Sequence, residues 1–343
     1  MGRSFTGWAT EVVSTAGSAG STGCAPDLSL DALMPLRSLF RPFLLLAVLA
    51  GLTLAAHAQS DAPPLPLELE ILGSGGPGAV GRAASSHVLR LDGVPRILVD
   101  AGPGAFARAG EAHIPLARIR TLLLTHLHAD HAGDLPGLLK AAAVSGPGPI
   151  PVRIFGPGGR DPYPATGRFV ELLFGAGGAF AYLPDFSAPL KLTVSELSPP
   201  ESAPITVFDE DGLRITAVRG HHGEAPAVAY RIDYRGRSIV FSGDMDEAGL
   251  PALVALAQDA DLLVFNSVVL DPPDSPAVLY TLHSPPAAIG RAAAEARVGR
   301  LLLAHIVPAV ETHSEAVLDS IRQHFKGPVE VAHDLQRLTP GAP

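Results

Sequence analysis

Residues 125–131, with the sequence THLHADH, hold three histidines and an aspartate directly after the apolar run IRTLLL. Side chains two residues apart in an extended segment point to the same side, so His126 and His128 can reach one metal ion. Asp130 and His131 come where the strand is expected to give way to a helix, and they can hold a second ion from the opposite side. A solvated strand end is the alternative, but four ligand-type side chains among seven positions favour a metal site.

Two metal ions need more ligands than this motif supplies, and the other candidates also follow apolar runs. ITAVRGHHG ends in His221 and His222, SIVFSGD ends in Asp244, and LLLAH ends in His305. A carboxylate such as Asp244 can bridge two ions, which a neutral histidine cannot do. Taken alone, His305 fits a hydrogen-bonded core histidine equally well, but the set as a whole favours a metal centre.

An apolar segment near the N-terminus has the features of a secretory signal peptide. The sequence from Met34 carries two arginines, an apolar run over 43–56, and then Ala-His-Ala. The run is short for a membrane span, although a retained anchor is the alternative. We therefore expect residues 34–58 to be a signal peptide and residues 1–33 to be a spurious, disordered extension. The protein is then periplasmic or secreted, with no membrane attachment after cleavage.

The rest of the chain reads as a Pro-rich linker over 59–66 and one hydrolase domain over 67–338. The only cysteine, Cys24, precedes both, so no disulfide or cysteine nucleophile is expected in them. In each half of the domain, short apolar runs separated by turn residues precede segments with a helical pattern. This order predicts an α+β fold in which two sheets pack together with helices outside.

The motifs THLHADH, SGD and LLLAHI, with a further histidine after a strand, resemble those of the metallo-β-lactamase superfamily over 67–338. The resemblance implies a four-layer αββα sandwich of two mixed β-sheets flanked by helices, with two metal ions, usually zinc, at one edge. By position it implies that the first ion is held by His126, His128 and His222 (or its neighbour His221), the second by Asp130, His131 and His305, and that Asp244 bridges them. Asp100 in LVDAGPG matches a buried aspartate near the metals of that family.

Within the superfamily, Asp244 separates the chain from true β-lactamases, which lack a bridging aspartate at this position. The chain resembles the ribonuclease Z and arylsulfatase-like or phosphodiesterase-like branch most, because it also has a histidine–serine pair before a helix, LHSPPAAIG. The resemblance makes His283 a candidate general acid and Asp130 the other catalytic candidate. A structural neighbour of the helix start is the alternative for His283.

Three departures separate the chain from ribonuclease Z itself. The HEAT motif of that family is FNSV here (265–268), which removes an acidic partner for His283. The stretch between the metal histidine and Asp244 is too short for the long arm that grips tRNA. The net charge is −9 without a Lys/Arg-rich stretch, whereas nucleic-acid-binding proteins normally carry a basic patch. We therefore expect no nucleic-acid partner.

These observations predict a dinuclear zinc hydrolase that uses metal-activated hydroxide on a phosphodiester, a sulfate ester or a related small ester. The expected partner is a small-molecule ester, and a homodimer is compatible with the sequence. Two alternatives stay open: a mononuclear iron relative that oxidises thiols, as sulfur dioxygenases do, and a ribonuclease Z-like endonuclease.

Two further hypotheses concern the substrate: Arg82 pairs with an anionic group, and the aromatic-rich segment 155–186 forms a lid. A surface arginine and a helix packed on the core are the respective alternatives.

Overall fold

The computed structural model describes residues 65–341, except 147, 186, 187, 202 and 273. The predicted N-terminal extension and signal peptide, and most of the linker, lie outside the described residues, so those predictions and the predicted location stay predictions. Within the described part, no helix is long and apolar enough to cross a membrane.

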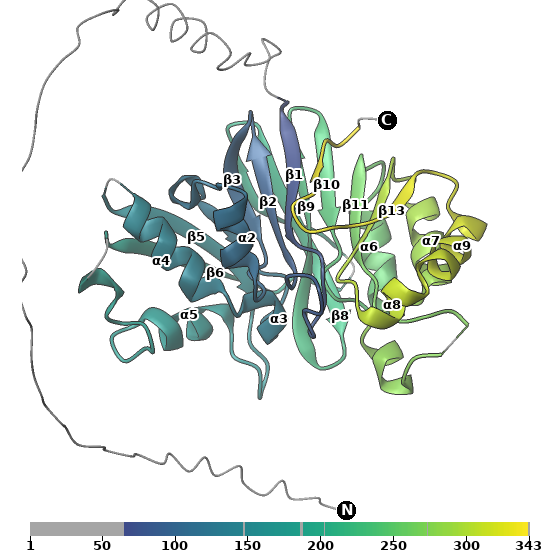
Figure 1. Cartoon of the computed structure of the whole chain (residues 1–343), viewed down its shortest axis with the longest axis horizontal. Coiled ribbons are helices and arrows are strands. Elements are labelled where there is room, and N and C mark those ends of the chain that lie inside the picture. The colour runs from purple at the N-terminus through teal and green to yellow at the C-terminus, as the bar shows by residue number, and fades with distance from the viewer. Residues whose placement is uncertain (1–64, 147, 186–187, 202, 273, 342–343) are drawn as a thin grey trace, which may run out of the picture. The chain divides into compact units, whose positions relative to one another are not determined.

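Two seven-stranded sheets form the centre of the molecule (Figure 1). The first has the spatial order β14 (Arg337–Leu338), β1 (Leu67–Gly73), β2 (Ser86–Leu91), β3 (Val94–Val99), β4 (Thr121–Leu123), β5 (Ile150–Pro157), β6 (Leu190–Leu197). The second has the order β13 (Val329–Val331), β12 (Leu301–Ala304), β11 (Leu262–Asn266), β10 (Arg237–Phe241), β9 (Ala225–Tyr234), β8 (Leu213–His222), β7 (Ile205–Glu210). In the first sheet the pairs from β14 to β3 are antiparallel and those from β3 to β6 are parallel. In the second sheet the pairs from β13 to β10 are parallel and those from β10 to β7 are antiparallel.

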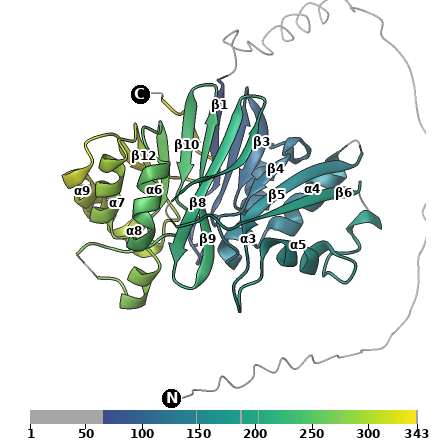
Figure 2. The ribbon, with the colours of Figure 1, turned by 180° about the vertical axis from the view of Figure 1, so that it is seen from behind.

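Helices cover the outer faces of both sheets, as the two opposite views show (Figures 1 and 2). On the side of the first sheet lie α2 (Ala105–Glu111), α4 (Leu135–Ser145) and α5 (Thr166–Phe174), and on the side of the second lie α6 (Leu250–Leu256), α7 (Pro286–Glu295) and α9 (Ser314–His324). Shorter helices are α3 (Ala129–Ala132), α8 (Pro308–Thr312) and the 3₁₀ turns η1 (Leu116–Arg118), η2 (Leu183–Asp185), η3 (Glu247–Gly249) and η4 (Ala277–Thr281). The predicted four-layer sandwich is confirmed.

The alternation of side chains along the strands explains why the layers form. In β1, Leu67, Leu69 and Ile71 are fully buried and pack between the two sheets with Ile215 and Ile239 of the second sheet. Two further apolar clusters lie between each sheet and its helices. Burial of apolar surface is the main favourable contribution to folding. The fold is therefore stabilised at three interfaces: one between the two sheets, and one between each sheet and its helices.

The parallel strands bring the candidate ligands to one edge of the sandwich. The carboxyl ends of β3 and β4 in the first sheet meet those of β10, β11 and β12 in the second, because parallel neighbours end at the same edge. Gly243 lies at this edge with φ +59°, and a Cβ there would come 2.8 Å from the Thr125 Cβ. Only glycine permits this approach of the two sheets without strain.

Some elements differ from the sequence-based expectation. The predicted strand IRTLLLT is shorter in the structure, where β4 covers only Thr121–Leu123 and the first metal-site histidines follow it in a loop. The strands β6 and β7 were not predicted. Both lie at sheet edges and alternate between half-buried and exposed positions, so they lack the apolar runs that mark the central strands.

A buried hydrogen bond links the two sheets directly behind the histidine motif. The Tyr230 hydroxyl on β9 donates to the Leu124 carbonyl at 2.9 Å, and Tyr230 is fully buried. Tyr230→Phe leaves this carbonyl without its side-chain donor, and we expect the free energy of unfolding to fall by about 1–3 kcal/mol. Urea unfolding followed by circular dichroism measures the change. An unchanged unfolding midpoint would show that the bond does not contribute.

Candidate metal centre

All seven predicted ligands lie at the sheet edge described above, and each follows a strand or begins a helix. His126 follows β4, His128 precedes α3, and Asp130 and His131 belong to α3. His222 ends β8. The second sheet also supplies Asp244 after β10 and His305 after β12. The site is therefore built from both halves of the chain.

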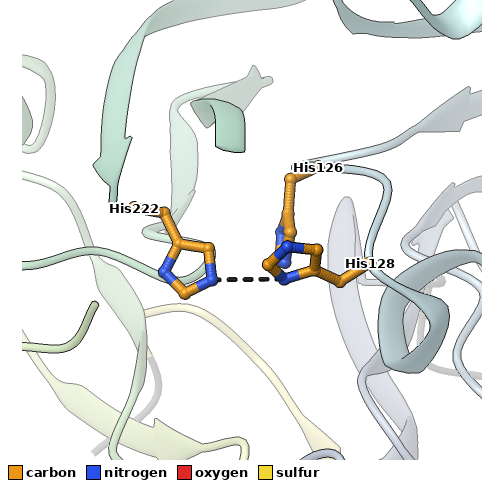
Figure 3. Close-up of side chains that lie close together, drawn as sticks. All are labelled: His126, His128 and His222. Carbon is orange, nitrogen blue, oxygen red and sulfur yellow. Dashed lines mark hydrogen bonds between the residues drawn. The ribbon is translucent and has the colours of Figure 1, made fainter. Parts of the chain in front are cut away.

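The first cluster consists of His126, His128 and His222, whose ligand atoms lie within 4.8 Å of one another. Figure 3 shows the three rings turned toward one another across the gap between the two sheets. His222 Nε2 lies 3.3 Å from His128 Nδ1. His126 and His128 face the same space, as their spacing predicted, although they do so from a loop.

The second cluster consists of Asp130, His131, Asp244 and His305, again with ligand atoms within 4.8 Å of one another. Asp130 Oδ2 lies 3.1 Å from His305 Nε2 and 3.7 Å from His131 Nε2. His305 has φ +59°, a left-handed conformation that non-glycine residues adopt rarely and that clusters at functional sites.

Asp244 lies between the two clusters and presents one oxygen to each. Its Oδ2 lies 3.6 Å from His222 Nε2 and 3.9 Å from His126 Nε2. Its Oδ1 lies 3.5 Å from both His131 Nε2 and His305 Nε2. This is the arrangement that a bridging carboxylate requires.

Hydrogen bonds from the Nδ1 atoms of three histidines fix their rings. His222 donates to the Leu282 carbonyl at 2.8 Å, and His131 donates to Asp100 Oδ2 at 2.7 Å. Asp100 also accepts from the backbone N–H and hydroxyl of Thr125, whose hydroxyl oxygen lies 3.1 Å from His126 Nδ1. Metal-binding histidines typically carry such partners on the second ring nitrogen.

The electrostatics of the site fit metal binding. Burial, and secondarily the neighbouring His131, hold the pKa of His126 well below its usual range, so this ring is neutral and its Nε2 lone pair is available. Burial and His222 lower the pKa of His128 in the same way. Although burial opposes it, the charge of neighbouring His305 and His131 holds the pKa of Asp244 well below its usual value, so Asp244 stays a carboxylate.

Unpartnered nitrogens in the interior provide a direct test of whether a metal fits. His126 Nε2 and His131 Nε2 are buried, and neither has a hydrogen-bond partner among the described residues. Buried polar atoms without a partner are costly, and both of these point toward Asp244. Ligands about 2.0–2.1 Å from a tetrahedral ion lie roughly 3.3 Å apart, close to the separations measured in both clusters. The residues present therefore fit metal ions.

His283 lies beside the clusters, within 4.8 Å of the ligand atoms of His222 and Asp244. Its ring centroid is 5.2 Å from that of His222 and 5.9 Å from that of His305. Burial lowers its pKa to about 4, and its buried Nδ1 has no partner in the described structure.

Asn266, the residue in place of the family's acidic one, has a different contact. It ends β11, and its side-chain amide donates to Asp244 Oδ1 at 2.7 Å. The sequence marks this position only by the absence of the family's acidic residue. The other site residues were located as polar residues at the end of an apolar run. The same rule applied to LLVFN identifies Asn266.

Three further residues or segments named in the sequence analysis lie elsewhere. His221 turns away from the clusters and pairs with Asp246, so His222 is the histidine brought to the site. Arg82 bonds the Ala332 carbonyl, Ser74 and Glu311, so it stabilises a loop and is occupied by these contacts. Within the aromatic-rich segment 155–186, residues Thr166–Phe174 form helix α5 on the core, and Phe174 and Phe180 line a separate apolar cavity of about 350 Å³. Of the segment's residues, the described contacts bring Tyr163 near the site, with its ring centroid 6.3 Å from that of His128.

The chain matches known proteins over most of its length. A family model described as a beta-lactamase superfamily domain matches residues 95–306. Ribonuclease Z of Mycobacterium avium (strain 104) is 34% identical over 293 residues, which cover 81% of this chain and 99% of that protein. Among solved structures, the short form of human tRNase Z has a TM-score of 0.62 at 24% identity, covering 80% of this chain and 100% of that chain. The metallo-beta-lactamase fold protein YhfI from Bacillus subtilis has a TM-score of 0.59 at 20% identity, covering 80% and 99%.

The relatives correct one expectation from the sequence. A small-molecule ester partner with no nucleic acid was predicted, and this is wrong, because the curated relatives at 30% identity or more are ribonucleases. The physical reason is that net charge sums the entire surface. A phosphodiester is bound by a few local donors and by bound metal ions, whose charge the sequence total of −9 does not include.

The contact between Asn266 and Asp244 leads to a prediction on metal affinity. Asn266→Ala removes the described amide donor to Asp244 Oδ1, so the carboxylate loses the bond that orients it toward His131 and His305. We expect the metal affinity of the second cluster to fall by about 10–100-fold, as for other outer partners of metal ligands. Competition titration with a chromophoric chelator measures it. Equal affinity of both proteins for every ion bound would contradict this role.

Proposed function

Because the chain belongs to the beta-lactamase superfamily and is a metallo-hydrolase that acts on ester bonds, we propose that it is a ribonuclease Z-like endonuclease that cleaves RNA phosphodiester bonds. One observation carries the proposal: the 34% identity to a ribonuclease Z extends over 99% of that relative. So extended a likeness includes the sheets, the helices and the loops that form the site. The complete set of clustered histidines and aspartates supports a hydrolytic site.

We further propose that the two clusters hold two zinc ions. His126, His128 and His222 would hold one, Asp130, His131 and His305 the other, and Asp244 both. Imidazole and carboxylate donors at these separations suit zinc, and the full ligand set disfavours the mononuclear iron alternative. Two bound zinc ions would supply an activated water and stabilise negative charge on the phosphoryl group.

The protein's own residues orient the reacting groups. Asp244 keeps one oxygen toward each cluster, and Asn266 holds that orientation through its amide. Asp100 and the Leu282 carbonyl keep the Nε2 atoms of His131 and His222 directed inward. His283 stands beside this assembly with an unpartnered Nδ1, where it can form a hydrogen bond to the oxygen that leaves the phosphorus.

The connection between β8 and β10 contains only β9 and short turns, so it forms no extended arm that could contact RNA. The residues that follow His222 run directly through β9 and β10 to Asp244, so contacts to RNA would come from the body of the domain. We therefore propose recognition close to the cleaved bond, with unpaired RNA as the substrate, since bases outside a helix can approach a concave site.

Cleavage of defined RNAs tests the function. Protein carrying its metal ions is incubated with a 5′-labelled single strand and with a labelled hairpin that has an unpaired 3′ tail, and the products are mapped on gels. We expect cleavage in unpaired RNA, and His126→Ala should lower the rate by at least about 100-fold because it removes a ligand. His324→Ala changes an exposed histidine at the end of α9 and serves as the control.

Metal analysis accompanies the assay. We expect about two zinc ions for each wild-type chain and fewer for His126→Ala, as measured by plasma mass spectrometry. Failure of the zinc-loaded wild-type protein to cut either RNA would refute the nuclease proposal. A single iron ion in each chain would refute the dinuclear zinc site.

We also propose an extracytoplasmic location, on the basis of the signal-peptide features of residues 34–58 alone. Mass spectrometry of the protein from fractionated cells tests it. We expect a processed N-terminus near Gln59 in the exported fraction, and an unprocessed chain confined to the cytoplasm would refute the proposal.

A further inference from the structure

A polar groove of about 410 Å³ lies next to the metal centre, with which it shares His222. It lies between the β8–β9 hairpin and the loops that follow β5 and β6, so both sheets contribute to its walls. Its lining includes His222 and His221, the arginines Arg160 and Arg219, and the acidic residues Glu201 and Glu224. A groove of this size and polarity can hold one nucleotide next to a phosphate at the metal centre.

His221 is held in this groove by a neighbouring carboxylate. Its Nδ1 donates to Asp246 Oδ2 at 2.7 Å, and the Asp246 side chain is only 9% exposed. Asp246 Oδ1 accepts from the Ala248 N–H at 2.9 Å, which fixes the carboxylate in turn. In the tautomer whose Nδ1 carries the proton of this bond, Nε2 is a hydrogen-bond acceptor. Within the described residues Nε2 has no hydrogen-bond partner, and the side chain is 51% exposed.

The two arginines of the groove are paired in a way that leaves them available. Arg219 contacts Glu201 at 3.3 Å, and Arg160 pairs with Glu224. The acidic side chains are 84% and 73% exposed, respectively. Ion pairs this exposed contribute little to stability, so a phosphate can replace the carboxylates at small cost.

We propose, on the basis of the proposed nuclease function, that this groove binds the nucleotide adjoining the cleaved phosphodiester and that His221 Nε2 accepts a hydrogen bond from its ribose 2′-hydroxyl. Arg160 and Arg219 then bind backbone phosphate farther along the strand. The 2′-hydroxyl is the group that lets a protein distinguish RNA from DNA at a given position. His221 and Asp246 thereby make one position of the substrate specific for ribose.

A purely structural role for the His221–Asp246 pair makes a different prediction. If the pair only stabilised the turn after Asp244, its loss would slow the cleavage of ribose and deoxyribose substrates equally. If His221 contacts the 2′-hydroxyl, removing the side chain and removing the hydroxyl delete the same bond, so their effects do not add.

The experiment uses the zinc-loaded full chain and a series of single-stranded RNAs that each carry one 2′-deoxy nucleotide near the cleaved bond. The ratio of kcat/KM for the all-ribose strand to that for each substituted strand is measured for the wild type, His221→Ala and His221→Gln. His324→Ala is the matched control, because it also replaces a histidine but lies on the exposed end of α9.

We expect the wild type to lose about tenfold in kcat/KM at one deoxy position, which corresponds to one hydrogen bond. His221→Ala should lose about tenfold on the all-ribose strand and show no further loss at that position. His221→Gln, whose amide oxygen is also an acceptor, should keep part of the preference, and His324→Ala should behave as the wild type.

Two outcomes would overturn the inference, and they differ in what they say of the nuclease itself. If the wild type cuts RNA but His221→Ala keeps the same ribose-to-deoxyribose ratios, the groove assignment is wrong while the nuclease proposal stands. If no strand is cut by the zinc-loaded wild type, the nuclease proposal fails and this inference fails with it.

Discussion

The buried carboxylate of Asp244 is the constraint on which the site depends. A carboxylate removed from water is costly unless charges or donors compensate it, and here the described compensation comes from imidazole nitrogens on both sides and from the Asn266 amide. Two histidine nitrogens that face it have no hydrogen-bond partner of their own in the described structure. Such an arrangement is stable when cations occupy the space between these atoms, so the fold around this edge and metal binding are coupled.

The sequence predicted those parts of the fold and the site that apolar runs mark, namely the buried strands and the residues that follow them. A buried strand must be apolar on both faces, and the residue after it must lie at the sheet edge, so His126, Asp244 and His305 could be located from sequence. The sequence favoured His222 over His221 by counting along the strand, and in the structure His222 Nε2 lies 3.3 Å from His128 Nδ1. Edge strands such as β6 carry too little apolar pattern to be recognised in this way.

Other features depend on which segments meet in space, and no local pattern specifies that. Arg82 looked free to bind an anion because it lies in a glycine-rich loop, yet Glu311 and the Ala332 carbonyl meet it from the far end of the chain. The aromatic-rich segment 155–186 looked like a lid, yet Phe169 and Phe174 belong to α5 and pack against the core. The exclusion of nucleic acid failed for a related reason: a net charge is a sum over residues and does not say which of them surround the site.

The two sheets repeat one plan, in which the change from antiparallel to parallel pairing comes at β3 in the first and at β10 in the second. Asp100 follows β3 and Asp244 follows β10, so the two buried aspartates hold corresponding positions in the two halves. The two aspartates nevertheless differ in their contacts: Asp100 orients His131, whereas Asp244 faces both clusters. The first half supplies His126, His128, Asp130 and His131, and the second supplies His222, Asp244 and His305, so each cluster is complete only when the two halves pack together.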